Sequence, residues 1–599
     1  MAVLRMSRIV AALLALTFAC FAGAADTIKV LRVAQGDIDT LDPEQWPDYF
    51  SGWVGAAIFE APYEWDYLAA PARLAPNTAA APPTISEDGK TWTVPLKRGI
   101  EFTDDPAFGG RPRELTANDY VYAFKRLLDP NLRRGGSPPL ADALEGARAL
   151  VDAARKPGAK FDYDAPFEGV RALDRYMLQL KLVAPNYPVI QQNLTEAYAV
   201  AREVVEAAGR DIGSHPVGTG PYRLKEWKRG SRIVLEANPR YRPIAFPKSE
   251  DPAHAALVES MQGKRLPQIG VVEISLIEEM QARLLEFEQG HLDYIELQGE
   301  MANRLLAHGK LKPEYAAMGI RRYPLPQTYV RYTYFNLKDP VVGGASKERV
   351  SLRRAIALAF DPDELVRVAY AGQAVPLGQI VPPRATTHDP TLPHGMRHDA
   401  ALARALLDRA GYDKRDAENF RLAPDGSRLT LSILTRPGTL WREWETLWKK
   451  NLTEVGLRVQ FRELPAQDQF KEMEAMHFQM SIAGWGGSPL GYVTLAQLES
   501  SQTPRVNASR FAMEEYDRLY AQMLREPDVQ KQVALSRRMS EIAQAYAPLI
   551  PHVAEVDNAF VQPWVQGFEP NDFTSYFKYL DVDVAAQQRA QLARSRAKR

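Results

Sequence analysis

The chain has 599 residues, of which 46% are hydrophobic and 25% charged, with 74 Lys plus Arg against 74 Asp plus Glu. This composition is close to the globular average and excludes a disordered chain, a multi-span membrane protein and a basic nucleic-acid coat protein. The length exceeds the roughly 250–300 residues that one hydrophobic core usually serves, so we expect two or more lobes.

The N-terminal segment has the pattern of a secretory signal peptide. Arg5 and Arg8 precede an apolar run at 9–21, and small residues follow at 22–25. The run is shorter than the roughly 20 apolar residues that a membrane-spanning helix needs. We therefore expect residues 1–25 to be removed on export, with cleavage after Ala24 or Ala25.

The single cysteine, Cys20, lies inside this segment, so the exported chain would have no thiol and no disulfide. A lipid anchor on Cys20 is the alternative, but the residues at 17–19 fit that type of signal poorly. Loss of Arg5 and Arg8 leaves slightly more acidic than basic residues, which argues against a nucleic-acid partner. The basic end at 589–599 is expected to be a solvated, frayed tail.

In the first half of the exported chain, short strands alternate with helices. Apolar residues alternate over 92–96, and Pro95 places this strand at a sheet edge. Thr116 and Asp119 have the spacing of a capping box before a helix over 121–128. Further strands and one helix follow at 176–182, 233–235, 271–277 and 280–290.

From about residue 329 the alternation of strands and helices becomes regular. A strand at 429–433, a helix at 441–455 and a strand at 457–461 form a unit that predicts parallel pairing through a right-handed crossover. The switching between periods of two and 3.6 predicts an α/β protein. The other elements expected here are a strand at 329–337, helices at 350–359, 399–411, 514–524 and 530–546, and extended chain at 550–560.

Motifs of several enzyme classes are absent from the sequence. It contains no GxxxxGK[ST] phosphate loop and no HExxH zinc helix. The Gly-Thr-Gly run at 218–220 lacks the third glycine of a dinucleotide fingerprint, and segment 486–490 has Leu490 where a nucleophile elbow needs glycine. We expect no enzymatic activity, no cofactor and no metal, and we interpret the one local histidine group as part of a solvated loop: His388, His394 and His398.

Five segments carry a resemblance to a known family. In order and spacing they resemble motifs of the family 5 extracellular solute-binding proteins, the receptors of peptide-type ABC importers: 91–102, 115–124, 218–239, 289–294 and 352–361. Gly218 and Gly220 suit a turn, and Pro221 suits the entry into the next strand. The resemblance implies an α/β, two-lobed periplasmic binding protein type II fold with an additional family-specific domain.

The resemblance also implies a division of the chain. Residues 26–59, 201–328 and 556–599 would form lobe I, 60–200 the extra domain and 329–555 lobe II. The lobes would close around a solute like a hinge.

The function implied by the resemblance is that of a periplasmic substrate-binding subunit of a peptide-type ABC importer. Its partners would be a peptide or peptide-like small solute and the complex of ABC permease and ATPase, and the subunit would be a monomer. One alternative is a receptor of the same fold that serves a membrane sensor. Another is a periplasmic hydrolase with Ser488 as its nucleophile, although no general base lies within reach in the sequence.

The segment at 483–488 corresponds to the strand that crosses the ligand cleft in peptide-binding relatives. In those relatives its backbone pairs with an extended ligand, and an aspartate at its last position neutralises the ligand's ammonium group. Here that position holds Ser488, and Ile482 stands where an arginine would read a peptide's carboxylate. Either another acid such as Asp48 replaces the aspartate, or the solute has no free amino terminus, which favours modified peptides and peptide-like solutes.

Two aromatic-rich segments favour a large, partly apolar pocket: one has Trp46, Tyr49, Phe50 and Trp53, the other Trp441, Trp444 and Trp448. Tyr49 lies on a segment that matches a ligand-facing loop of the family. Trp441 recurs with Trp444 and Trp448 on one helical face, which is typical of a helix core but leaves a ligand contact open. The expected ligand-binding residues are Asp48, Tyr49, Trp441, Gly484, Trp485, Gly486, Ser488 and Asn507.

Overall fold

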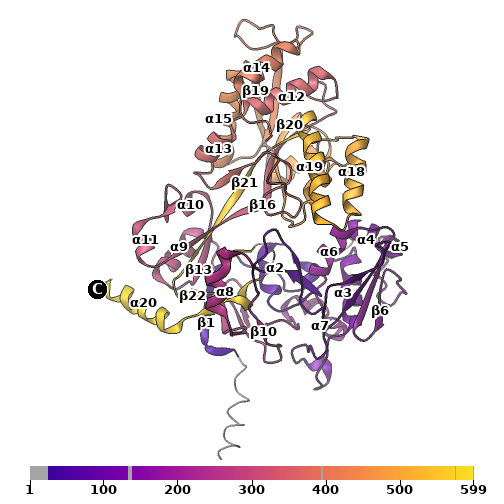
Figure 1. The fold of residues 1–599 in the computed structure, drawn as a ribbon, viewed down its shortest axis with the longest axis vertical. Coiled ribbons are helices and arrows are strands. Elements are labelled where there is room, and N and C mark those ends of the chain that lie inside the picture. Colours follow the sequence, from indigo (N-terminus) through magenta and orange to yellow (C-terminus); the bar gives the residue numbers. More distant parts are fainter. Residues whose placement is uncertain are drawn as a thin grey trace, which may run out of the picture.

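The computed structural model describes residues 25–46, 48–132, 138–392, 395–571, 573 and 575–597. The predicted signal peptide, apart from its last residue, lies outside these ranges, as does His394. None of the helices within the ranges is long and apolar enough to cross a bilayer. In Figure 1 the N-terminal segments lie in a broad lower part, and most of the chain between about residues 350 and 550 builds a narrower upper part.

The first sheet of the lower part has four strands. β1 (Asp26–Gln35) pairs in parallel with β12 (Ile269–Leu276), which is followed across the sheet by the antiparallel strands β9 (Arg232–Ala237) and β8 (Tyr222–Lys228). Its core also takes buried residues from the region after 559, near the C-terminus. The helices around it are α2 (Tyr49–Gly55), α8 (Ala255–Met261), α9 (Met280–Gln289), α10 (Gly299–Asn303) and α20 (Val584–Ala597).

The second sheet of the lower part has the order β4 (Thr84–Ile85), β5 (Thr91–Pro95), β7 (Met177–Lys181) and β6 (Val170–Asp174). The edge position predicted from Pro95 is wrong, because β5 pairs on both sides. β4 begins with Thr84 opposite Thr93, so Pro95 lies beyond the paired residues and its missing N–H costs no bond to β4. The accompanying helices are α3 (Ala117–Leu128), α4 (Pro138–Ala143), α5 (Ala147–Ala154), α6 (Tyr187–Glu196) and α7 (Arg202–Ala208).

The start of α3 shows how the sequence sets a local boundary. The capping box predicted from Thr116 and Asp119 is present, and the Thr116 backbone N–H donates to Asp119 Oδ2 at 2.7 Å. The buried residues around this helix and its sheet come from 63–217 and form a hydrophobic cluster of their own.

The upper part is built on the largest sheet. Its order is β13 (Tyr294–Leu297), β21 (Leu549–Val561), β16 (Arg321–Phe335), β20 (Met480–Gly486), β18 (Thr430–Thr435) and β19 (Arg458–Glu463), with β17 (Ala374–Pro376) also on β21. The predicted parallel pairing of the strands around the helix at 441–455 is confirmed, since β18 and β19 are parallel.

Helices cover both faces of this sheet. The core on one face includes Trp444 and Trp448, which are fully buried, so the core interpretation of these two tryptophans is confirmed. The core on the other face includes Tyr332 and Tyr516. The helices are α12 (Lys347–Ala359), α13 (Pro362–Val368), α14 (Ala400–Arg409), α15 (Thr439–Glu454), α16 (Ala466–Glu474), α18 (Glu514–Leu524) and α19 (Val529–Tyr546).

Two long strands, β16 and β21, run from the lower part into the upper part (Figure 1). Their ladder is interrupted where Pro326 pairs with Val556 but Val330 pairs with Ala554, so that Gln327 to Tyr329 lie opposite the single residue Glu555. Such a bulge bends a strand and breaks its pairing. It falls at the residues where we predict the boundary between the lobes, although the predicted division itself stays a prediction.

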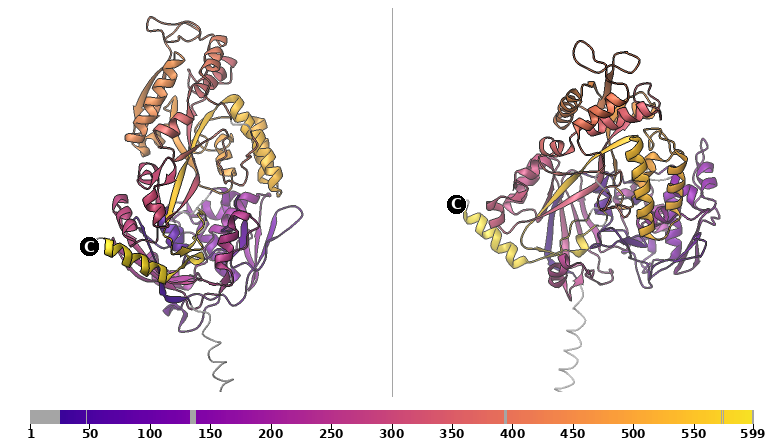
Figure 2. Two further views of the ribbon diagram at one scale, coloured as in Figure 1. Left: turned by 60° about the vertical axis from the view of Figure 1, so that its left-hand side comes forward. Right: turned by 45° about the horizontal axis from the view of Figure 1, so that its top comes forward.

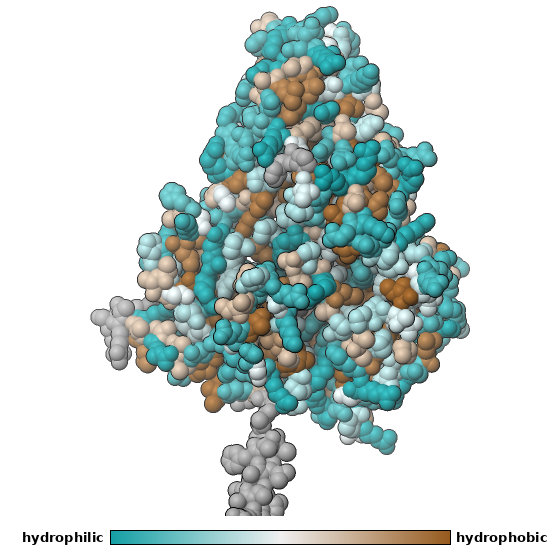
Figure 3. Space-filling model, in the orientation of Figure 1, coloured by the Kyte–Doolittle hydropathy of each residue, from teal (hydrophilic) through white to brown (hydrophobic). Residues whose placement is uncertain are grey.

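The upper part also contacts the helices that accompany the second sheet of the lower part. In Figure 2 α18 and α19 descend toward the violet segments of the chain, and the Tyr492 hydroxyl donates to Gln192 Oε1 on α6 at 2.6 Å. The face shown in Figure 3 is mainly hydrophilic, with small separate hydrophobic patches, as is usual for the exterior of a globular protein.

The C-terminal segment corrects one expectation. α20 extends to Ala597, so most of the predicted frayed tail is helical. Arg594 donates to Gln562 Oε1 at 2.9 Å, and its guanidinium carbon lies 5.4 Å from the centre of the Trp564 ring. Stacking on an aromatic ring explains why this basic residue packs rather than extending into solvent.

Candidate functional site

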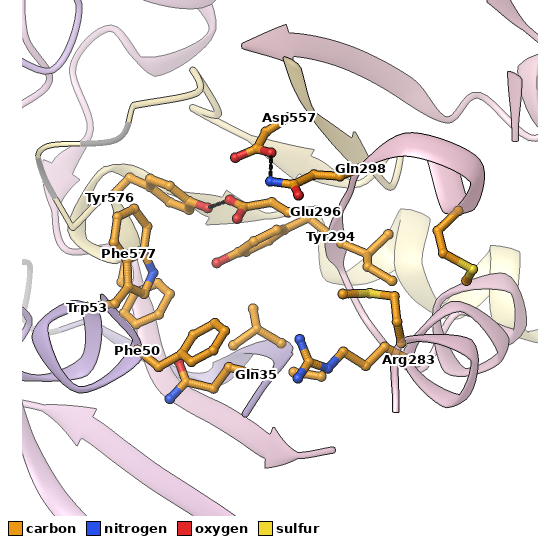
Figure 4. A pocket seen from close by; sticks show the side chains of 15 residues that line it. Gln35, Phe50, Trp53, Arg283, Tyr294, Glu296, Gln298, Asp557, Tyr576 and Phe577 are labelled. Atoms are coloured by element: carbon orange, nitrogen blue, oxygen red, sulfur yellow. Dashed lines mark hydrogen bonds between the residues drawn. The ribbon is translucent and has the colours of Figure 1, made fainter. Parts of the chain in front are cut away.

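A cavity of about 400 Å³ opens in the lower part between β1 of the first sheet and β13 of the largest sheet (Figure 4). The end of β1 forms one wall, β13 another, and α2 and α9 contribute the sides. One chamber with an aromatic and aliphatic lining is therefore built from three segments that are distant in sequence: 33–53, 280–301 and 557–577. Its residues are Val33, Ala34, Gln35, Phe50, Trp53, Met280, Arg283, Tyr294, Ile295, Glu296, Gln298, Met301, Asp557, Tyr576 and Phe577.

The short helix α2 brings two aromatic rings to this cavity. Asp48 caps the helix, and its Oδ1 accepts a hydrogen bond from the Ser51 backbone N–H at 2.9 Å. This is the usual role of an aspartate at such a position. Phe50 and Trp53, one turn apart, then point into the chamber (Figure 4). Trp53 packs edge-on against Tyr576, with ring centres 4.5 Å apart.

Two carboxylates lie at one end of the chamber. The Tyr576 hydroxyl donates to Glu296 Oε1 at 2.8 Å, and Gln298 and Gln327 both donate to Asp557. Desolvation raises the pKa of Glu296 above the usual carboxyl range. A second cavity, of about 290 Å³, shares Glu296 and Asp557 and continues along the β16 side chains. This end of the chamber can therefore attract a cationic group.

Arg283 lies at another side of the chamber. It is 7% exposed, and its Nε donates to the Ile277 backbone carbonyl. Among the residues that the structure describes it forms no ion pair, and desolvation lowers its pKa. Its guanidinium points inward in Figure 4. The chamber thus has carboxylates and a cation on separate walls.

The upper part contributes an open strand edge. Every residue of β20, from Met480 to Gly486, pairs with β16, whereas β18 pairs with β20 only at Met480 and Ser481. In the described chain no strand covers the second edge of β20 at 483–486. Gly484 allows Tyr329 to lie directly on this strand, since a Cβ there would be 1.9 Å from the Tyr329 hydroxyl oxygen.

The structure brings together only part of the predicted ligand set. Gly484 and Trp485 line a small recess beside the open edge, and Trp485 Nε1 donates to the Val493 carbonyl at 3.0 Å. Gly486, at φ 127°, is the last residue of β20 and pairs with Tyr329. Trp441 lies at the first turn of α15, 9% exposed.

The other predicted residues have structural partners. The Asp48 carboxylate caps α2 and does not line the chamber. Ser488 Oγ accepts from the Leu490 backbone N–H at 3.1 Å, within its own loop. Asn507 is buried and donates to the carbonyls of Glu499 and Phe511. The side chain of Tyr49 lies outside the described part of the structure. Ligand contact by these residues stays a prediction.

Phe50 and Trp53 come from an aromatic-rich segment that predicts a pocket, but the sequence reasoning missed the rest of the lower-part chamber. The other lining residues are single members of ordinary strands and helices, so no local motif marks them. One signal was available: Asp557 and Glu296 are charged residues inside otherwise apolar strands, a pattern that marks functional positions. Nothing in the described ranges groups three metal-ligating side chains, and the Nδ1 atom of His388 contacts the Val381 carbonyl.

Residues 73–502 match the profile of the bacterial extracellular solute-binding proteins, family 5. The chain belongs to this family. It is 24% identical over 559 residues to the probable deoxycholate-binding periplasmic protein YgiS of Escherichia coli, with 91% of this chain and 92% of the relative aligned. It is also 24% identical over 553 residues to the glutathione-binding protein GsiB of Salmonella choleraesuis, with 90% of this chain and 92% of that relative aligned.

A solved structure supports the fold of this family 5 protein. The unliganded, open form of the periplasmic murein tripeptide-binding protein MppA superposes with a TM-score of 0.70 at 21% identity, over 92% of this chain and 97% of that one. The fold is therefore the two-lobed type II fold of periplasmic binding proteins with the family's additional domain, as predicted. The chain is a solute-binding protein.

Proposed function

We propose that this family 5 protein captures a peptide or peptide-like solute in the periplasm and delivers it to the permease and ATPase of an ABC importer. The open edge of β20 at 483–486 carries the proposal, because an extended peptide can add to such an edge through main-chain hydrogen bonds. The partner ATPase would supply the energy of transport. The chain itself would bind, close and release, as a monomer and without a catalytic step.

The lower-part chamber supplies the carboxylates that the β20 segment lacks. Ser488 stands where peptide-binding relatives have a carboxylate, but Glu296 and Asp557 line the chamber on the facing lobe. A solute with an amino group would be held there. A solute that occupies both the open edge and the chamber would bridge the lobes and favour their closure.

Calorimetric titration with unmodified tripeptides and with their N-acetyl derivatives tests this proposal. We expect the free-amine peptides to bind more tightly, and Glu296→Gln to reduce that preference by about 10-fold, the effect of one charge-assisted hydrogen bond. Glu300→Gln, which alters an exposed carboxylate on α10, is the matched control. Equal affinity for both peptide classes would reject the amine site, and no binding of any peptide would reject the peptide class.

The raised pKa of Glu296 adds a pH dependence. A carboxyl group with a raised pKa takes up its proton at a higher pH than usual, and the neutral acid attracts an ammonium group less. We expect affinity for free-amine peptides to fall as the pH is lowered toward the raised pKa of Glu296. The Glu296→Gln variant should lose most of this dependence, and a variant with the slope of the wild type would contradict the assignment.

Export can be tested separately. N-terminal sequencing of protein from a periplasmic extract should find a start at Ala25 or Asp26. A start at a lipidated Cys20 would contradict the proposed soluble periplasmic form.

A further inference from the structure

One arginine of the lower-part chamber faces open space instead of an anion. Arg283 on α9 is 7% exposed, and its Nε donates to the Ile277 backbone carbonyl. Within the described part of the chain, its two terminal nitrogens donate to no residue. Figure 4 shows the guanidinium directed into the chamber. The bond to Ile277 thus anchors the group and leaves both terminal nitrogens available to a ligand.

The charge of Arg283 is not neutralised from within the protein. Glu278 attracts it through space, but the two side chains form no ion pair in the described structure. Glu278 is exposed, and its Oε1 accepts from the Asp37 backbone N–H at 2.7 Å. Desolvation lowers the pKa of Arg283, and the attraction of Glu278 opposes this only in part. A buried cation of this kind is costly until an anion completes its hydrogen bonds.

The surroundings of Arg283 suit a bound carboxylate. Its guanidinium carbon lies 5.9 Å from the centre of the Phe50 ring, which restricts the orientation of the planar group. Met280 and Met301 belong to the apolar lining of the same chamber. An apolar lining strengthens a charge pair because it lowers the local dielectric constant. The fork of donors on a guanidinium matches the two oxygens of a carboxylate.

The opposite charge lies on another wall of the same chamber (Figure 4). Glu296 accepts from the Tyr576 hydroxyl, and Asp557 accepts from the side-chain amides of Gln298 and Gln327. The chamber therefore presents carboxylates on one side and a guanidinium on another. This pattern is complementary to a single residue that carries both an ammonium group and a carboxylate.

We propose that Arg283 binds the carboxylate of an acidic first residue whose amino group lies at Glu296 and Asp557. The preferred solute is then a peptide that begins with glutamate or aspartate, or the free acidic amino acid. The inference rests on the proposed function, because that function places the amino group of the solute in this chamber. Arg283 would thus determine specificity for the side chain next to the amine.

Calorimetry with three probes tests the subsite: Glu-Ala-Ala, Gln-Ala-Ala and free glutamate. The two peptides share the amine, the backbone and the terminal carboxylate, and they differ only in the charge of one side chain. We expect the wild type to bind Glu-Ala-Ala about 10- to 100-fold more tightly than Gln-Ala-Ala, the range for hydrogen bonds to charged groups. A ratio of two affinities does not change when part of the protein is unfolded.

Substitutions assign this preference to Arg283. Arg283→Gln should bind the two peptides equally, and Arg283→Lys, which keeps the charge, should retain part of the preference. Arg304→Gln alters an exposed arginine at the end of α10, outside the chamber lining, and should keep the wild-type ratio. Should Arg283→Gln show no cooperative thermal unfolding, Arg283→Lys replaces it: a reduced ratio supports the subsite and an unchanged ratio rejects it.

The outcomes separate this subsite from peptide capture in general. If the wild type binds both peptides equally well, the subsite is wrong but peptide capture stands. If glutamate binds, neither peptide does and Arg283→Gln abolishes the binding, the subsite stands but the peptide class is wrong. If no probe binds, or if folded Arg283→Gln keeps the wild-type ratio, the subsite is rejected.

Discussion

At the scale of single residues, burial determines the protonation state of His552. It lies on β21, fully enclosed, with its ring centre 4.6 Å from Phe360 and 5.0 Å from Trp444. Among the described residues, the His552 ring makes one polar contact, in which Nε2 lies 2.8 Å from Thr333 Oγ1. Desolvation lowers the pKa of His552 to about 3, so the ring is neutral in the folded protein.

This depressed pKa predicts an acid-sensitive stability. The unfolded chain would take up a proton near pH 6.5, whereas the folded protein resists it down to about 3. The contribution of neutral His552 is therefore complete above pH 6.5 and is lost progressively as the pH falls toward 3. Urea unfolding from pH 7.5 to 4 should show a shallower decline in stability for His552→Gln than for the wild type.

The control is His477→Gln, which alters an exposed histidine. Its stability should follow the wild type across the same pH range. Parallel curves for His552→Gln and the wild type would show that His552 does not carry the effect.

Gly484 is required by the close approach of Tyr329. A methyl group on residue 484 would overlap the Tyr329 ring and displace it from the open edge of β20. We expect Gly484→Ala to weaken solute binding by about 10-fold or more, as overpacking forces side-chain and backbone shifts. In a Tyr329→Ala background the same substitution should have little further effect. An equal loss in both backgrounds, measured as a double-mutant cycle, would contradict this steric explanation.

At the scale of elements, a buried ion pair joins α3 to the segment after β1. Arg126 donates from one nitrogen to both oxygens of Asp42, at 2.6 and 2.8 Å, and both side chains are less than 5% exposed. Asp42 also accepts from the Glu44 backbone N–H. The pair therefore fixes how α3 lies against the loop that follows β1.

Removal of one partner should be strongly destabilising. Arg126→Met leaves the Asp42 carboxylate buried and uncompensated, and we expect a loss of about 3–5 kcal/mol in the free energy of unfolding. The double variant Asp42→Asn/Arg126→Met should recover part of this lost free energy of unfolding. Arg148→Met, which breaks an exposed pair with Asp142, should cost about 0–1 kcal/mol in the same urea titration. Equal losses for both arginine variants would contradict the role of burial.

At the scale of the whole molecule, the bulge between β16 and β21 is the structural candidate for the hinge. It interrupts the ladder at Glu555, which forms an ion pair with Arg331, and it lies two residues from Asp557 of the chamber. A solute at this point would contact both lobes. Closure would then follow from binding, because contacts to both lobes exist only in the closed form.

Small-angle scattering can measure this closure. The radius of gyration should decrease when a bound solute is added to ligand-free protein. The same solute should leave the radius of Glu296→Gln unchanged at concentrations that saturate only the wild type. A radius that is unaffected by saturating solute would contradict hinge closure.

Local patterns predicted much of the secondary structure. The capping box at Thr116, the helix end at Gly290 with φ 80° and the helix start near Asp399 all occur where expected. These features depend on hydrogen bonds and backbone preferences within a few residues, which the order of amino acids states directly. The β18–α15–β19 unit was predictable for the same reason, since its parallel pairing follows from one connection.

The site was decided by tertiary packing. Tyr329 and Gly484 are separated by more than 150 residues, and they lie in close contact because β16 pairs with β20. Glu296 and Asp557 share a cavity because β13 pairs with β21. Ser488, which the family pattern placed in the cleft, bonds to its own loop. Whether a charged side chain can bind a ligand depends on the groups that surround it. In this protein those groups lie on strands that only the folded sheet brings together.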